Sequence, residues 1–333
     1  FDIPGIADEV ALLVSDVMSQ SVNLSSFKVF VNDVQVGEQI VDVISDSVYG
    51  AKGRGRRDTL QVDPSAMGAL SRTQHAVSYS FQRGSSGRSI GYLDFFSLHI
   101  SRKLALYGNQ TRFRNSLSVE NAVEYRITGI QPNTSIWNIT NFFEPRLQQY
   151  SLEGQEARFS SPATQFIAAE YIIFNQDIPS PRLVGPVETQ NLHGLSTPDY
   201  LIITTEAFRN EAERLAEHRA KLNSWSTAVT TTEEIYNEFS SGRQDVTAIR
   251  DFIRHLYLQS PRLKNVLLFG KSSYDYKQRL TNNTNFVPTY ESRNSLSPLE
   301  TYSSDDFFGF LEEHEGEWAE NNFIQTHTMD IGV

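Results

Sequence analysis

The sequence predicts an antiparallel β-sandwich-like region followed by a parallel α/β sheet. Apolar and polar residues alternate through residues 1–178, which is the period of half-buried strands. Prolines then gather in residues 179–198, and from residue 199 short apolar runs alternate with helical stripes. We therefore expect one or two β modules over 1–178, a proline-rich linker over 179–198 and an α/β domain over 199–333.

The first region carries several strand signatures with turn signals between them. Residues 77–82 and 123–128 alternate apolar and polar side chains, so each strand should turn one face into a core. Asn32 and Asp33 separate two valine-rich runs, and both residue types tolerate positive φ in a tight hairpin turn. Residues 84–88 separate the strand at 77–82 from a longer one at 90–102. Short strands with few helical stretches favour a sandwich or a pair of small β modules.

The middle segment changes composition. It contains Pro179, Pro181, Pro186 and Pro198, and proline both fixes φ and lacks a backbone donor. The segment should be either an extended linker or a strap along a neighbouring surface.

The last part reads as β/α units. Residues 200–203 and 228–231 are strand-like, while residues 266–269 are apolar throughout, as in a parallel strand that is covered on both faces. One helix should follow the first strand, with an apolar stripe at Phe208, Ala212, Leu215 and Ala216. A second should begin after Asp245 as N-cap, with a stripe at Ile249, Phe252, Ile253 and Leu256. Residues 331–333 should begin a further strand with one unpaired edge.

Composition bounds the chemistry. The chain has 333 residues, 39% of them hydrophobic and 21% charged, which is the composition of a folded protein. It has no cysteine, so disulfides, cysteine metal sites and thiol catalysis are excluded within these residues. No apolar run reaches the roughly 20 residues that a membrane-spanning helix needs. The chain begins at Phe1 without a signal peptide, and we expect such a leader to have been removed or to lie outside this chain.

The net charge of −11 is concentrated at one end. Residues 294–333 contain no Lys or Arg and hold nine acids: Glu300, Asp305, Asp306, Glu312, Glu313, Glu315, Glu317, Glu320 and Asp330. The rest of the chain is nearly neutral, so a nucleic-acid partner is disfavoured. The basic cluster Lys52, Arg54, Arg56 and Arg57 lies among glycines, which favours a flexible surface loop.

Functional groups of a parallel sheet usually lie beyond the carboxyl ends of its strands, so the loop after Phe269 is the first place to search. Its residues 270–276, 285–292 and 302–309 resemble the surface sortase of the type IX secretion system, a gingipain-like cysteine peptidase. Residues 198–204, 234–242 and 247–250, and upstream residues 92–95, 108–110 with 113–114, and 136–140, carry the same resemblance. It identifies the α/β part as the first portion of a caspase-like domain, truncated at residue 333.

The resemblance implies a cell-surface hydrolase, exported and associated with the outer membrane, that acts in protein transport. Such an enzyme removes the C-terminal sorting domain of secreted cargo and attaches the cargo to anionic lipopolysaccharide, and it docks on an outer-membrane β-barrel partner. Its His and Cys pair performs attack by a thiolate and transfer of the acyl group to water or an amine. Both residues lie in the second half of the domain, so no catalytic residue is expected among these 333, and this chain alone should be inactive.

The histidines and the acids of residues 294–333 are the remaining candidates for site residues. A Ser–His arrangement such as Ser304 with His314 lacks a supporting motif, so the seven histidines are expected to be structural or exposed. Asp305, Asp306, Glu313 and Glu315 are candidate ligands of a structural Ca²⁺, which prefers carboxylate oxygens. Similar sortases carry an Asp where this chain has Lys271, and a cation there disfavours the metal. Phe307 and Phe308 are expected to pack in the core.

Two alternatives to the sortase reading stay open. One is a non-catalytic gingipain-like binding or scaffold protein of the bacterial surface, favoured by Lys271 in an otherwise typical loop. The other is a β-sandwich adhesin joined to a nucleotide-binding α/β domain. For the latter, the residues after Ile203 and Phe269 lack the glycine spacing of a phosphate-binding loop.

Overall fold

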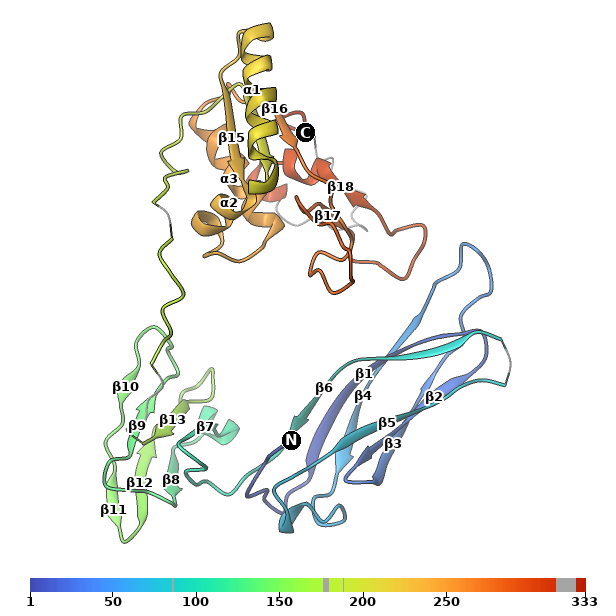
Figure 1. Ribbon diagram of the computed structural model, residues 1–333. Coiled ribbons are helices and arrows are strands. Elements are labelled where there is room, and N and C mark those ends of the chain that lie inside the picture. The colour runs from blue at the N-terminus through green and yellow to red at the C-terminus, as the bar shows by residue number, and fades with distance from the viewer. Residues whose placement is uncertain (86, 176–179, 188, 316–327) are drawn as a thin grey trace. The chain divides into compact units, whose positions relative to one another are not determined.

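The computed structural model describes residues 1–85, 87–175, 180–187, 189–315 and 328–333. The chain forms two compact units, one of Phe1–Asp46 with Lys52–Val184 and one of Ser47–Ala51 with Gly185–Val333. The first unit is built from antiparallel sheets and the second around a parallel sheet, so the predicted fold class is confirmed (Figure 1). Among the described residues no helix is long and apolar enough to cross a membrane.

The first β module pairs two three-stranded antiparallel sheets. One has the order β4 (Arg54–Val62), β1 (Ala11–Ser21), β6 (Ser89–His99), and the other β3 (Val34–Val41), β2 (Ser25–Val31), β5 (Val77–Gln82). Alternate side chains of β1 are buried, and Leu13 and Val17 are fully so. The β2–β3 turn has φ of 48° at Asn32 and 68° at Asp33, which confirms the predicted hairpin. A short 3-10 turn lies at Ala69–Ser71.

The basic cluster is the part of this module where the sequence prediction was wrong. Arg54, Arg56 and Arg57 belong to strand β4 and pair with β1 instead of forming a loop. Arg57 bonds to Asp16 at 2.7 Å, and Arg56 lies 2.9 Å from Asp58. The prediction failed because charged residues and glycines are not typical of a strand. In β4 the arginines form ion pairs with acids on the same strand and on β1.

The second β module has its own core. Its sheets have the orders β10 (Arg146–Leu147), β9 (Ser135–Asn138), β13 (Glu170–Phe174), β7 (Gln110–Arg114) and β11 (Ser151–Glu153), β12 (Glu156–Ser161), β8 (Val123–Ile127). A 3-10 turn at Ser116–Val119 separates β7 from β8. Ile127, Ile136 and Ile173 are fully buried, and the rings of Tyr125 and Phe159 lie 5.0 Å apart. The predicted alternation at residues 123–127 is confirmed by β8.

The second unit is a parallel sheet of order β15 (Thr227–Thr231), β14 (Tyr200–Thr204), β16 (Asn265–Leu268), with helices on both faces (Figure 1). Ile202 on β14 packs with Ala212 and Ala216 of α1 (Arg209–Asn223). Leu201 and Ile203 face the other way, toward α2 (Thr232–Phe239) and α3 (Val246–Gln259). The predicted β/α pattern and the Asp245 cap, which accepts from the Thr247 N–H at 2.8 Å, are confirmed.

Residues 331–333 lie next to β16. Gly332 forms a parallel bridge with Asn265, with the Val266 N–H donating to the Gly332 carbonyl at 2.8 Å. The remaining short elements of this unit are η3 (Glu206–Phe208), β17 (Tyr290–Glu291), β18 (Ser303–Ser304), η4 (Asp305–Gly309) and η5 (Glu313–Glu315). Phe307 and Phe308 of η4 are 4% and 0% exposed, as expected of core residues.

Candidate functional site

A hollow of about 290 Å³ lies at the carboxyl edge of the parallel sheet. Its walls come from three connections that leave the strands: Thr205–Ala207 after β14, Thr232 and Glu233 after β15, and the loop after β16 at Asn285, Phe286 and Pro288. Tyr236 of α2, Gln244 and Gln278 complete the lining. This is the edge at which the crossover connections of a parallel sheet gather polar groups.

A second hollow of about 750 Å³ adjoins the first, because both are lined by Glu206 and Glu233. Its other walls are Pro186, Val187, Thr189, Gln190, Arg209, Thr231, Glu234 and Asn237. The two hollows together form a groove. One side of it is lined by Pro186, Val187, Thr189 and Gln190, which precede the α/β sheet, and the other by the start of α2.

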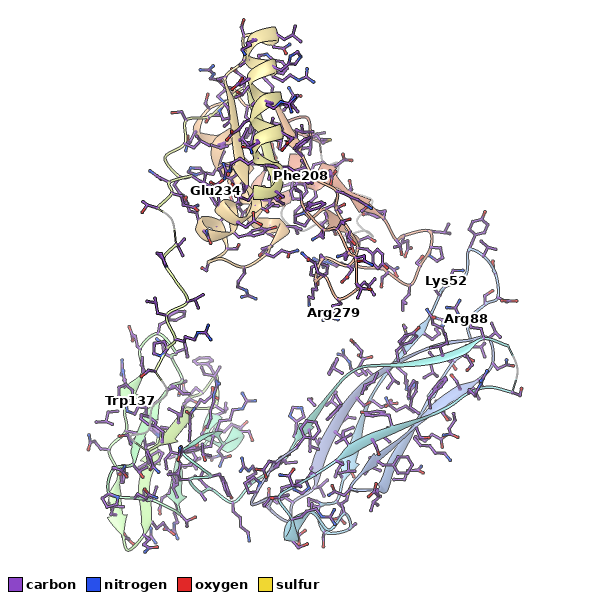
Figure 2. All side chains as sticks on the ribbon, in the orientation of Figure 1. Lys52, Arg88, Trp137, Phe208, Glu234 and Arg279 are labelled. Carbon is purple, nitrogen blue, oxygen red and sulfur yellow. The ribbon has the colours of Figure 1, made fainter. Side chains whose placement is uncertain are left out.

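The start of α2 is fixed by a capping box. The Thr231 side chain accepts from the Glu234 N–H at 3.2 Å, while the Glu234 carboxylate accepts from the Thr231 N–H at 2.8 Å. Arg209 holds Glu234 at 2.7 Å and Glu206 at 2.8 Å, so it ties the connections after β14 and β15 together. Figure 2 labels Glu234 among the side chains of the α/β unit. Burial raises the pKa of Glu234, but the hydrogen bonds from Thr231 and Arg209 outweigh it and the pKa lies below its ordinary value.

Two polar side chains inside the first hollow are almost wholly buried. Thr205 and Tyr236 are each 9% exposed, and the Thr205 hydroxyl has no hydrogen-bond partner among the described residues. Burial, reinforced by Glu233 and Asp245, raises the pKa of Tyr236 far above its usual range, so this phenol stays neutral. Two residues with neutral hydroxyl groups therefore line the hollow beside Glu206 and Glu233.

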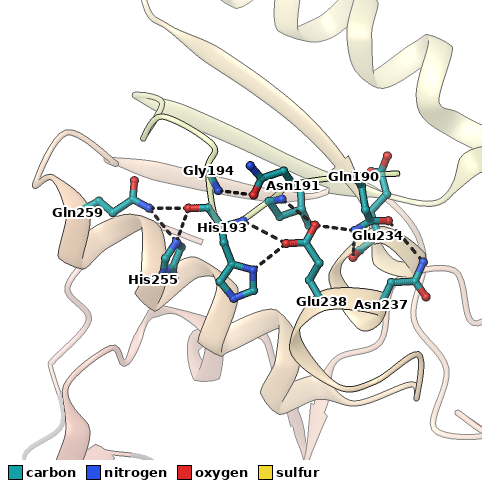
Figure 3. Close-up of polar contacts among 10 residues, drawn as sticks. Gln190, Asn191, His193, Gly194, Glu234, Asn237, Glu238, His255 and Gln259 are labelled. Carbon is teal, nitrogen blue, oxygen red and sulfur yellow. Dashed lines mark hydrogen bonds and ion pairs between the residues drawn. The ribbon is translucent and has the colours of Figure 1, made fainter. Parts of the chain in front are cut away.

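A second polar cluster holds the segment at residues 190–194 onto α2 and α3 (Figure 3). The Glu238 carboxylate accepts from the Leu192 N–H at 2.7 Å, from the His193 N–H at 3.1 Å and from the Gln190 amide at 2.9 Å. The His193 ring nitrogen Nδ1 lies 2.7 Å from the same carboxylate. Burial raises the pKa of Glu238, yet these hydrogen bonds prevail and lower it to about 2.

The histidine ring of this cluster is also stacked. His193 lies parallel to Phe239 with 4.5 Å between ring centroids, and its carbonyl oxygen lies 3.1 Å from His255 Nε2. The sequence left open whether the proline-rich segment is a linker or a strap. Its residues 180–187 contain no helix or strand, whereas Gln190 and His193 lie against α2 and α3, and Asp177 and Pro179 lie outside the described residues.

The four predicted calcium ligands are not gathered into one site. Asp305 accepts from the Thr289 hydroxyl at 2.6 Å, and Glu315 is buried and accepts from the Glu312 N–H at 3.0 Å. Asp306 and Glu313 are exposed on separate 3-10 turns. Among the described residues no group of three or more His, Asp or Glu side chains could hold a metal ion. Glu317, Glu320 and His327 lie outside the part of the chain that the structure describes.

The described end of the acidic segment, which reaches Glu315, is instead held by arginines of α3. The buried Arg250 donates to the carbonyl oxygens of Phe310 at 2.6 Å and Glu312 at 2.9 Å, and Arg254 donates to that of Leu311 at 2.9 Å. Burial lowers the pKa of Arg250, although neighbouring carboxylates counteract it. Lys271 is exposed and takes no part in these contacts.

None of the described histidines lines either hollow. His75 is buried beside Asn32, with Nδ1 3.2 Å from the amide nitrogen, and His314 lies 3.2 Å from Glu312. His99 and His218 are exposed. Each described histidine thus has a structural or surface position.

Sequence reasoning missed the groove, α2 and the Glu238 cluster. The spacing Thr231-x-x-Glu234 is a capping-box signal that announces a helix start directly after β15. Thr205, Glu206 and Glu233, which follow the first two strands of the parallel sheet, match no motif in the sequence that marks them as lining a groove. No sequence signal links Glu238 to residues 190–193, which lie about 45 positions away.

The α/β unit and the whole chain both resemble known proteins. Residues 193–333 match the model of peptidase family C25. The whole chain is similar to the crystal structure of dimeric latent PorU from Porphyromonas gingivalis, with a TM-score of 0.78 and 20% sequence identity. The match covers 99% of this chain but 32% of that one. No curated protein sequence matches the chain. The resemblance predicted from the loops after β16 is thus confirmed, and the solved structure shares the fold.

Proposed function

We propose, from the match of residues 193–333 to peptidase family C25, that this chain is the N-terminal part of a cell-surface cysteine peptidase of the sortase type. The enzyme would remove the C-terminal sorting domain of type IX secreted cargo and attach the cargo to anionic lipopolysaccharide. The observation that carries the proposal is this family match on a parallel sheet with a groove at its carboxyl edge.

The chain's own residues set a limit on the chemistry they perform. They include no cysteine, so no thiolate can attack a scissile carbonyl here. No described histidine reaches the groove. We infer that the His and Cys pair belongs to the remainder of a longer protein, and that this chain contributes the first half of the α/β domain and two β modules. Calcium has no part in this proposal, because the candidate ligands do not converge.

The partners follow from the same proposal. They are secreted proteins with a C-terminal sorting domain, a lipopolysaccharide acceptor and an outer-membrane β-barrel protein, at the cell surface. The β modules, with two separate cores, would supply the surfaces for such contacts.

A second candidate is a non-catalytic scaffold of the same family. Lys271, exposed in the loop after β16, favours it because similar sortases carry an acid at this position. The scaffold would keep the groove and the β modules without the nucleophile.

Cleavage of a fluorescent cargo fused to a sorting domain tests the proposal. We expect the purified 333-residue chain to release no product, and a longer protein that contains it to release product in a reaction abolished by a thiol-alkylating reagent. A longer protein that binds the cargo without cleaving it would support the scaffold. Cleavage by the 333-residue chain itself would refute the assignment of the nucleophile to residues outside it.

A further inference from the structure

We propose that one end of the second β module binds the surface of a lipid bilayer by inserting two apolar loops. The loops are the β9–β10 turn at residues 139–145 and the β12–β13 connection at residues 162–169. Their large exposed apolar side chains, named here the apolar tip, are Phe142, Phe143, Phe166 and Ile167. This site lies in a different part of the chain from the groove and does not depend on the proposed function.

The side chains of the apolar tip project far into solvent. Phe142 is 78% exposed, Phe143 92%, Phe166 87% and Ile167 60%. The rings of Phe142 and Phe143 lie edge to face, with 6.1 Å between their centroids. A single exposed apolar residue is common on a protein surface, but four such side chains at one end of a small module mark a contact site.

Strand pairing brings the two loops together (Figure 1). The first loop follows β9 and the second precedes β13, and these strands are antiparallel neighbours in one sheet. The Ile139 N–H donates to the Glu170 carbonyl at 2.8 Å, and the Glu170 N–H donates to the Thr140 hydroxyl oxygen at 2.9 Å. The loops therefore start from adjoining points. The chain enters β7 and leaves β13 at the other end of the sheet, where the Asn175 N–H donates to the Asn109 carbonyl at 3.1 Å.

Hydrogen bonds hold the backbone of both loops in place. In the first loop the Asn141 side chain accepts from the Phe143 N–H at 3.1 Å, and the Asn141 carbonyl accepts from the Glu144 N–H at 3.1 Å, which together form an Asx turn. In the second loop the Gln165 N–H donates to the Val119 carbonyl at 2.9 Å. A loop that is already ordered loses less conformational entropy when its side chains enter another phase.

Behind the apolar tip lies a layer that suits the boundary between acyl chains and headgroups. Trp137 of β9, labelled in Figure 2, lies opposite Ile172 of β13 and Leu147 of β10. Ile136 is fully buried, so Trp137 and its strand partners lie on the outer face of the sheet, where Leu147 is 57% exposed. Tryptophan is favoured at membrane interfaces because its ring is apolar and its N–H is polar.

The charges near the apolar tip suit zwitterionic headgroups. Arg112 pairs with Glu170 at 2.5 Å, and Arg146 lies 3.7 Å from Glu144. Residues 162–169 carry no charge. Because positive and negative side chains are paired here, attraction to anionic lipids is weak and the apolar side chains supply most of the affinity.

A bilayer fits the shape of the apolar tip better than a protein partner does. A stable protein–protein interface buries about 800 Å² on each partner over a broad, complementary surface. The rings of the apolar tip instead project from the ends of two turns, so a protein would need a pocket for each of them. Acyl chains are fluid and close around projecting groups without a preformed pocket.

Flotation with phosphatidylcholine vesicles measures the binding. We expect the 333-residue chain to float with the vesicles. Phe142→Ser combined with Phe143→Ser should weaken partitioning about a hundredfold, at roughly tenfold for each lost ring. The matched control is Leu152→Ser, because Leu152 is 55% exposed on β11, at the other end of the same module. This control should bind as the parent chain does.

Quenching by lipids that carry bromine on their acyl chains tests insertion directly. The fluorescence of the added ring in Phe143→Trp should be quenched when vesicles are present, and binding should persist at high salt. Because the substituted side chains are exposed, the serine variants should keep the circular dichroism spectrum and melting temperature of the parent chain.

Three results would overturn the proposal. They are absence of flotation of the parent chain, equal flotation of the double serine variant and Leu152→Ser, and absence of quenching in vesicle-bound Phe143→Trp. Self-association through the same phenylalanines without vesicle binding, measured by sedimentation, would assign the apolar tip to an interface between copies of this chain and also refute the proposal. The cargo-cleavage experiment bears on none of these outcomes.

Discussion

Glu238 stabilises a tertiary contact through a single carboxylate. Its side chain is 15% exposed and accepts hydrogen bonds from two backbone N–H groups of the segment at residues 190–193. A hydrogen bond to a charged acceptor contributes about 1.5–3 kcal/mol to the free energy of unfolding. Glu238 therefore contributes to holding this segment on α2, together with the stacking of His193 on Phe239.

The first prediction concerns removal of that carboxylate. Glu238→Ala should lower the free energy of unfolding of the α/β unit by about 2–3 kcal/mol, because two backbone donors lose their acceptor. Glu238→Gln keeps one acceptor oxygen and should lose less. Urea unfolding measures both, with Glu213→Gln, on the exposed face of α1, as the control. Equal stability of Glu238→Ala and the parent chain would show that the contact contributes nothing.

The second prediction follows from the pKa of the same residue. Because folding lowers the pKa of Glu238 from 4.5 to about 2, its contribution is complete above pH 4.5 and is lost as the pH falls toward 2. Asp199, held by Ser226 and Arg262, has its pKa lowered to about 2 and acts in the same direction. Unfolding free energies at pH 7, 4 and 3 should therefore fall steadily. Glu238→Gln should be less stable at pH 7 and show a flatter decline, and an unchanged slope would contradict the assignment.

At the scale of elements, short local signals set where chains turn and helices begin. The β2–β3 turn puts Asn32 and Asp33 at positive φ, and α2 begins at the capping box of Thr231 and Glu234. The sequence signals of this turn and of this helix start each span four residues or fewer, because the hydrogen bonds and dihedral angles that define them are local.

The third prediction tests the hairpin turn. Asp33 has φ of 68° and glycine adopts that conformation without a Cβ clash, so Asp33→Gly should raise stability by about 0.5 kcal/mol. Asp33→Val, β-branched at the same angle, should lower it by about 1–2 kcal/mol. Chemical denaturation measures the pair, and the order of the two variants is the decisive result.

The fourth prediction tests the start of α2. Thr231→Ala removes the acceptor for the Glu234 N–H and should cost about 1 kcal/mol. Thr231→Ser keeps the hydroxyl and should stay near the parent value. Loss of stability in the serine variant as large as in the alanine variant would mean that packing of the threonine methyl, and not the cap, matters here.

At the scale of the whole molecule, two compact units with separate cores should unfold separately. The fifth prediction is that calorimetry of the 333-residue chain shows more than one transition. Ile203 is fully buried in β14, so Ile203→Ala should lower the free energy of unfolding of the α/β unit by about 2–5 kcal/mol. Only the melting transition of that unit should then shift to lower temperature. The matched change Ile136→Ala in the second β module should spare that transition. A single transition shifted by both variants would contradict independent units.

The fold class, the family resemblance, eight of the eighteen strands and two of the three α-helices of the described residues follow from the sequence alone. These depend on periodicity, caps and turn residues, which act over a few positions, as in the β14 run and the Asp245 cap of α3. Which distant residues come into contact is known from the tertiary structure and not from the sequence. Arg57 of β4 forms an ion pair with Asp16 of β1, and Glu238 accepts a hydrogen bond from the backbone N–H of Leu192. Glu206 and Glu233, which follow different strands, line the same groove. Such contacts are set by strand order and packing, which bring together residues whose sequence spacing carries no signal.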